Sequence, residues 1–190
     1  RNCLPRRAGV GGCALVTIDV SADLDVYYAD TGGSFGIPPV AEKIERLCRD
    51  GKRAMWAGIK AVKSYGKINE IGRAIQSFAD KNRYTLIRNL ASHGVGGALH
   101  EAPGHIPTWF EPSDARRIPD GLVFTIEPFL STGSHLAIDG EDDWTLLADG
   151  GHPTVQYEHT LVATKRGAVV VTMTSLPPTT TKQRSPPVTR

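Results

Sequence analysis

Two aspartates, Asp19 and Asp30, flank the stretch TIDVSADLDVYYAD, in which polar and apolar residues alternate. Alternation of this kind predicts a β-hairpin, and a turn at residues 23–25 would place residues whose numbers sum to 49 opposite each other. Asp19 and Asp30 would then face each other on one side of the sheet. Like charges in that position repel, and a cation between them removes the repulsion. The spacing therefore indicates a metal site, with two exposed acids in another register as the alternative.

Two histidines, His93 and His100, lie in the glycine-rich segment ASHGVGGALHEAPG. Glycine lets the backbone approach a ligand closely. Histidine is a common metal ligand and the usual proton donor near neutral pH. Taken alone, the segment is equally compatible with a surface loop that contains incidental histidines.

Two glutamates lie in apolar, β-rich segments. Glu127 ends the run FTIE before Pro128, and Glu158 lies inside VQYEHTLVAT. A carboxylate in such a strand is rarely buried unless it is paired or bound to a metal. His159 points to the opposite face from Glu158, so we expect it to support the site or the fold rather than to bind metal.

The elements that must position these residues follow from periodicity. After the hairpin of residues 14–35, apolar residues at helical spacing predict one helix that ends near Gly66 and a second that has Asn69 as its N-cap. Short strands are predicted around residues 85–89, 123–127, 156–164 and 168–174. A hairpin, two helices and then antiparallel strands indicate an α+β fold.

Length and composition limit the function classes. The chain has 190 residues, the size of one domain, and a formal net charge of +2 with scattered basic residues, which gives no case for nucleic acid or membrane partners. Three cysteines without metal-ligand spacing suit free thiols in a reducing cytosol. The Pro- and Thr-rich residues 175–190 are predicted to be disordered, which leaves residues 1–174 as the domain.

The ordered set Asp19, Asp30, His93, Glu127 and Glu158 resembles the metal ligands of the type I methionine aminopeptidases. The motifs IDVSADLD, YYADTG, NEIGRAIQ, HGVGGALHEAP, FTIEPF, DDWTLLADGG and QYEHTLV extend the resemblance over residues 10–174. The short interval between Glu127 and Glu158 leaves no room for the long insertion of the type II enzymes. The resemblance implies the pita-bread fold, a curved antiparallel sheet flanked by helices.

By this resemblance, the five residues would hold two divalent ions, with Co, Mn, Fe or Zn as the candidate metals. Asp19 would bind one ion and His93 the other, while Asp30 and Glu158 would bridge them. Glu127 would be a ligand that also carries a proton. Two ions that share carboxylates can acidify a bridging water for attack on a peptide carbonyl.

The resemblance also implies roles around the substrate. His100 would donate a hydrogen bond as the tetrahedral centre forms, and Leu99 and Trp144 would line the methionine pocket. The implied activity is removal of the N-terminal methionine from nascent polypeptides, by a cytoplasmic monomer that works near the ribosome.

The family pattern is incomplete at the N-terminus. The family carries a histidine about eighteen residues before the first aspartate, and no histidine precedes His93 here. The family's N-terminal helices and pocket loop also have no counterpart, so we expect part of the hairpin's packing surface to be exposed. Two alternatives remain, namely a non-catalytic binding member of the fold and a related aminopeptidase that cleaves before proline.

Overall fold

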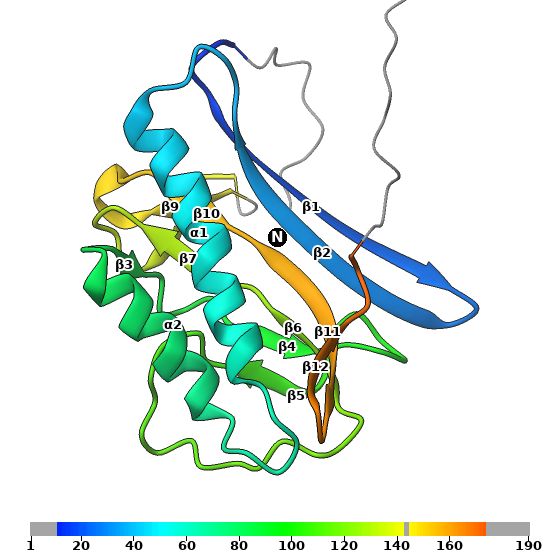
Figure 1. Cartoon of the computed structure of the whole chain (residues 1–190). Coiled ribbons are helices and arrows are strands. Elements are labelled where there is room, and N and C mark those ends of the chain that lie inside the picture. The colour runs from blue at the N-terminus through cyan, green and yellow to red at the C-terminus, as the bar shows by residue number, and fades with distance from the viewer. Residues whose placement is uncertain (1–10, 143–144, 174–190) are drawn as a thin grey trace, which may run out of the picture.

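A curled antiparallel sheet with two helices against one face dominates the computed structural model, which describes residues 11–142 and 145–173 (Figure 1). The helices are α1 (Glu42–Ala61) and α2 (Asn69–Lys81), with a short 3-10 turn, η1, at Asp149–Gly151. The strands are β1 (Leu15–Leu24), β2 (Tyr27–Gly36), β3 (Thr85–Leu86), β4 (Ser92–Gly94), β5 (Glu101–Ile106), β6 (Val123–Ile126), β7 (Phe129–Ser131), β8 (Ala137–Asp139), β9 (Leu146–Ala148), β10 (Thr154–Gln156), β11 (Glu158–Thr164) and β12 (Gly167–Val170). The predicted α+β class is confirmed.

The main sheet has seven strands in the order β1-β2-β11-β6-β4-β5, and β12 pairs with the second half of β11. β11 is therefore central, because β6 lies along one side of it and β2 joins the other side at Glu158 and His159. A three-stranded sheet, β10-β7-β3, and the β8-β9 pair complete the described part of the chain. One strand was predicted over residues 156–164, but Tyr157 separates β10 from β11, so Glu158 begins its strand.

The β1-β2 hairpin differs in register from the prediction. The strands join through a two-residue turn, Asp25-Val26, so Asp19 pairs with Gly32 and Ser21 pairs with Asp30. Both turn residues have positive φ, 50° and 68°, which is the geometry of a tight hairpin turn. Asp19 and Asp30 are thus diagonal neighbours rather than direct partners. They still share one face of the sheet, because the register error is two residues and side chains alternate with period two.

The two helices follow the predicted apolar stripes, with changes at their ends. α1 ends at Ala61, not near Gly66, and its acidic first turn and Lys60 in the last turn complement the helix dipole. The N-cap of α2 is Ile68 and not Asn69. Asn69 is the first helical residue, and its buried amide Nδ2 donates a hydrogen bond to the Glu111 carbonyl at 3.2 Å.

Both helices cover the same face of the main sheet. A Cβ atom built on Gly58 of α1 would meet Ile75 of α2 and Ile126 of β6, so the three backbones approach closely there. Side chains alternate along a strand, so Thr125 points to the face opposite Ile126. The helix-covered core contains Leu47, Ala54, Met55, Ile59, Ile71, Ile75, Phe124, Ile126, Leu130 and Leu161, all fully or nearly fully buried.

We predict that Gly72→Ala destabilises the fold by about 1–3 kcal/mol, although alanine is the better helix former. A Cβ at Gly72 would overlap the carbonyl oxygen of Trp109, and a backbone atom cannot yield as a flexible side chain can. Urea unfolding measures the change. The exposed Ser77 of the same helix offers a control, because Ser77→Ala should stay within about 0.5 kcal/mol of the parent. Equal stability of the two variants would contradict the packing argument.

One face of the β1-β2 hairpin is apolar and exposed, as the sequence predicted. Ile18, Val20, Leu24 and Tyr27 share the face that points away from Asp30, and each is at least 51% exposed. No described helix is long and apolar enough to span a membrane. Cys13 and Cys48 are free thiols, whereas Cys3, Trp144 and residues 175–190 lie outside the described residues.

Candidate metal centre

The sheet register brings four of the predicted ligands to one place on the face opposite the helices. Glu158 at the start of β11 is opposite Gly32, which puts Asp30 diagonally beside it on the same face. His159 pairs with Ile126, so the same register continues to Glu158 and Glu127. His93 comes from β4, the neighbour of β6. Four segments that are far apart in the chain therefore meet on one face of the curled sheet, over its central strands.

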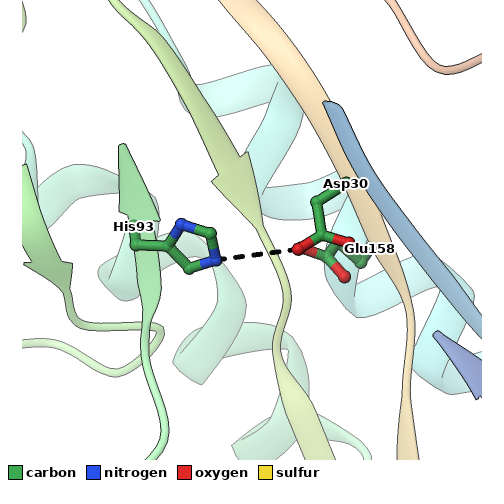
Figure 2. Close-up of side chains that lie close together, drawn as sticks. All are labelled: Asp30, His93 and Glu158. Atoms are coloured by element: carbon green, nitrogen blue, oxygen red, sulfur yellow. Dashed lines mark ion pairs between the residues drawn. The ribbon is translucent and has the colours of Figure 1, made fainter. Parts of the chain in front are cut away.

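Three of these side chains are close enough to share one ion. Asp30, His93 and Glu158 are all buried, and one ligand atom from each lies within 4.8 Å of the others. Figure 2 shows the imidazole of His93 pointing across the sheet toward the two carboxyl groups. His93 Nε2 is 4.0 Å from Asp30 Oδ2 and 3.4 Å from Glu127 Oε1. Glu127 therefore belongs to the same cluster.

The hydrogen bond on the far side of the His93 ring fixes its tautomer. Nδ1 lies 3.0 Å from the Gly94 carbonyl oxygen, which can only accept, so Nδ1 carries the proton. Nε2 is then left with a free lone pair that faces the carboxyl groups. This is the arrangement by which protein histidines present themselves to a metal. Burial lowers the pKa of His93, which favours the neutral, ligating form.

Burial and mutual repulsion raise the pKa values of the two glutamate carboxyl groups in this cluster. Burial, followed by the charges of Glu127, Asp30 and Asp19, raises the pKa of Glu158 to about 10. Burial raises the pKa of Glu127 to about 8; a hydrogen bond from Thr125 lowers it, and the charges of Asp19 and Asp30 raise it further. Four acids that each disfavour ionisation of the others need positive charge among them if they are to ionise together.

Asp19 lies at the rim of the cluster. It is exposed on β1, and partial burial and the Asp30 charge raise its pKa, while a hydrogen bond with Glu158 lowers it. The structure thus brings all five predicted ligands together, with Asp19 as the one that solvent reaches most easily.

The donor set fits a divalent ion. Glu158 is 1% exposed, and its Oε2 accepts a hydrogen bond from Gln156 Nε2 at 3.0 Å. Its other oxygen, Oε1, has no hydrogen-bond partner among the described residues, although such an atom is costly to bury. A ligand bond to a cation would satisfy it. One imidazole with several carboxylates suits Mn, Fe, Co or Zn.

The predicted substrate residues surround the cluster incompletely. The exposed His100 ring lies against the His93 ring, with centroids 4.0 Å apart and planes tilted by 36°, so a second imidazole lies beside the ligand set. Leu99 is half-buried beside it in the chain. Trp144, the other predicted pocket residue, falls outside the described residues. His159 is on the helix side, where its ring contacts Trp56 and its Nδ1 hydrogen-bonds Thr172, in agreement with a supporting role.

Sequence reasoning missed the residues that hold the ligands in place. Thr125 Oγ1 accepts the His93 amide at 3.1 Å and donates to Glu127 Oε1 at 3.0 Å, and Ser92 Oγ accepts the Glu127 amide. Gln156 supports Glu158 in the same way. Thr125 and Gln156 each precede a glutamate by two residues. That spacing was the available signal, since residues i and i+2 of a strand share a face.

Comparison with known proteins agrees with this geometry. Methionine aminopeptidase 2 of Bacillus subtilis is 36% identical over 158 residues, which cover 83% of this chain and 64% of that protein. The crystal structure of methionine aminopeptidase from Rickettsia prowazekii superposes with a TM-score of 0.78 at 34% identity, over 82% of this chain and 63% of that one. The Thermotoga maritima methionine aminopeptidase gives 0.79 at 28% identity, over 84% and 64%.

These matches confirm the predicted pita-bread fold and the resemblance to methionine aminopeptidases. The chain spans a little under two thirds of the relatives' length, 63–64% in the three compared above. Residues 5–165 match the family described as "Metallopeptidase family M24". The chain therefore belongs to metallopeptidase family M24.

Proposed function

We propose that this chain removes N-terminal methionine from peptides and proteins with the help of two divalent ions. The observation that supports this most is the convergence of Asp19, Asp30, His93, Glu127 and Glu158 on one sheet face, in a chain that is similar to methionine aminopeptidases. The same similarity favours methionine over a proline-directed specificity. The complete ligand set favours catalysis over a purely binding role.

In this proposal Asp19, Asp30, His93, Glu127 and Glu158 would hold the two ions. The ions supply Lewis acidity for the peptide carbonyl and lower the pKa of water. The protein supplies the rest. Glu127, whose pKa is raised by burial, would take a proton at Oε1 or Oε2 from the attacking water and return it to the amine that leaves when the peptide C–N bond breaks.

His100 acts on the substrate side. Its ring is exposed above His93, so it can donate a hydrogen bond to the oxygen that becomes negative in the transition state. Leu99 and Trp144 are proposed to keep the methionine pocket apolar. We assign this activity to a domain of residues 1–174, in a monomeric cytoplasmic protein that meets its substrates as they leave the ribosome.

The test is cleavage of Met-Ala-Ser against Leu-Ala-Ser by the metal-loaded chain. We expect the methionine peptide to be hydrolysed at least tenfold faster, since a branched side chain fills an unbranched pocket poorly and misfit costs about 1–3 kcal/mol. Release of free amino acid, followed chromatographically, measures both rates. Equal rates would remove the methionine assignment, and no cleavage of either peptide by fully metal-loaded protein would favour the non-catalytic alternative.

A further inference from the structure

A positively charged groove lies between α1 and α2, on the face of the sheet opposite the metal centre. Its volume is about 610 Å³, and it is lined by Arg49, Lys52, Arg53, Trp56, Ala57 and Lys60 of α1 with Phe78 of α2. The proposed aminopeptidase activity uses none of these residues. In Figure 1 the two helices run along the outside of the sheet, so a ligand here would leave the metal centre open.

The groove has a strong excess of positive charge. Four of its seven lining residues are Lys or Arg, and none is acidic. Asp50 of α1 is 3% exposed and forms ion pairs with two of these cations, Arg53 at 3.2 Å and Arg49 at 3.9 Å, and with Arg46 at 3.4 Å. Lys52 and Lys60 form no ion pair within the described residues. With Asp50 counted against the four cations, three positive charges remain for an external anion.

Two aromatic residues, Trp56 and Phe78, give the groove an apolar surface in addition to its positive charge. Trp56 and Phe78 are half-buried, so each ring presents part of its surface to the groove. Trp56 is held from behind by His159, whose ring contacts it edge-on at a centroid distance of 6.0 Å. A fixed aromatic surface between lysines is what an unpaired base needs for stacking while its phosphates are neutralised.

We propose that this groove binds single-stranded RNA, with phosphates on Arg49, Lys52, Arg53 and Lys60 and a base against Trp56. The cations extend over twelve residues of α1, from Arg49 to Lys60, about 16 Å along the helix axis, which suits an extended strand. A duplex keeps its bases stacked inside and cannot use the aromatic surface. An acidic peptide would satisfy the cations but has no group that gains from Trp56. The proposal revises the sequence-based expectation that nucleic acid is not a partner.

The test measures binding of a short fluorescein-labelled oligouridylate to the full chain by anisotropy as KCl is raised. Three or four phosphate contacts predict that log K falls with log[KCl] with a slope of about −2 to −3. Lys52→Gln/Lys60→Gln should reduce the steepness by about 1.4 and weaken binding at low salt about tenfold. Both lysines are exposed, so the variant keeps the fold.

Lys67→Gln/Lys165→Gln is the matched control, because it removes the same charge from exposed positions outside the groove lining. It should retain parental affinity and slope. Trp56→Phe should bind within about threefold of the parent, whereas Trp56→Leu should lose at least fivefold, as expected for one stacked base.

Three outcomes would overturn the proposal. They are absence of oligouridylate binding at low salt, equal losses in the two lysine double variants, and equal binding of the phenylalanine and leucine variants. An oligoglutamate peptide that binds as tightly as the oligouridylate would also overturn it, in favour of an acidic protein partner. None of these measurements depends on peptide hydrolysis, so they remain informative if the proposed aminopeptidase activity fails.

Discussion

Addition of Mn²⁺ or Co²⁺ to the metal-free chain is expected to raise the midpoint of thermal unfolding, Tm, by about 5–10 °C. An ion present at a hundred times its dissociation constant stabilises the folded state by about 2.7 kcal/mol. For a chain of this size each kcal/mol shifts Tm by about 2–4 °C. The ion binds only the folded state tightly, because the five proposed ligands come from five separate segments of the chain. Circular dichroism before and after dialysis against chelator measures the shift.

Asp30→Asn tests whether the shift belongs to this cluster. The variant keeps the shape of the side chain and the Ser21 Oγ hydrogen bond at 3.1 Å, but it removes the carboxylate that lies within 4.8 Å of the ligand atoms of both His93 and Glu158. We expect the metal-dependent Tm shift to disappear. The metal-free variant should be no less stable than the metal-free parent, because one buried charge has been removed from a group of like charges.

Asp23→Asn is the matched control on the neighbouring strand β1, exposed and outside the cluster. It should retain the full metal-dependent shift. If Asp23→Asn and Asp30→Asn lose the shift equally, the ion binds elsewhere. A parent whose Tm ignores both metal and chelator would refute the metal centre altogether.

Glu127→Gln is expected to lower turnover of a methionine peptide by about 10²–10⁴, the usual contribution of a positioned proton carrier. Glutamine keeps the size of the side chain and an oxygen that can accept from Thr125 Oγ1. It cannot take up a proton near neutral pH. Turnover is measured at saturating Mn²⁺, with metal occupancy followed by isothermal titration calorimetry so that lost metal and lost proton transfer are separated.

Glu101→Gln provides the comparison for Glu127. Glu101 is an exposed acid of β5, next to His100 in the chain, and its carboxylate accepts the Ala98 amide at 3.2 Å. We expect near-normal turnover from this variant. Near-normal turnover from Glu127→Gln at full metal occupancy would reject the proton-transfer role and leave Glu127 as a ligand only.

The sequence predicted which acidic and histidine side chains come together, but not the hairpin register. Tight hairpin turns usually contain glycine or asparagine, whereas this turn is Asp25-Val26, with valine at a φ of 68°. No turn motif in the sequence indicates a turn at Asp25-Val26. The alignment of β1 and β2 with the rest of the sheet follows only from the pairing of β2 with the central strand β11. The prediction that Asp19 and Asp30 lie close together still holds, because a displacement of two residues keeps both side chains on the same face of the sheet.

Tertiary contacts account for the other differences. Asn69 is a good N-cap by type, but its amide is used by the distant Glu111 carbonyl, which no local pattern reveals. From the sequence, the basic residues that line the groove were interpreted as scattered surface charges. Their spacing of three, four and seven residues places them on one side of a helix, and helical periodicity could have identified them as one cluster: Arg49, Lys52, Arg53 and Lys60.

The central position of β11 also determines when in folding the metal centre can exist. Asp30 is held by Thr160, which accepts the Asp30 amide at 2.9 Å and donates to its carbonyl at 2.7 Å across 130 residues of chain. Contacts between such distant residues form late, because long loops must close first. A bound ion therefore has little influence on how fast the chain folds. Metal binding is expected mainly to lower the rate of unfolding. The folded lifetime of the metal-bound protein should therefore increase more than its folding rate.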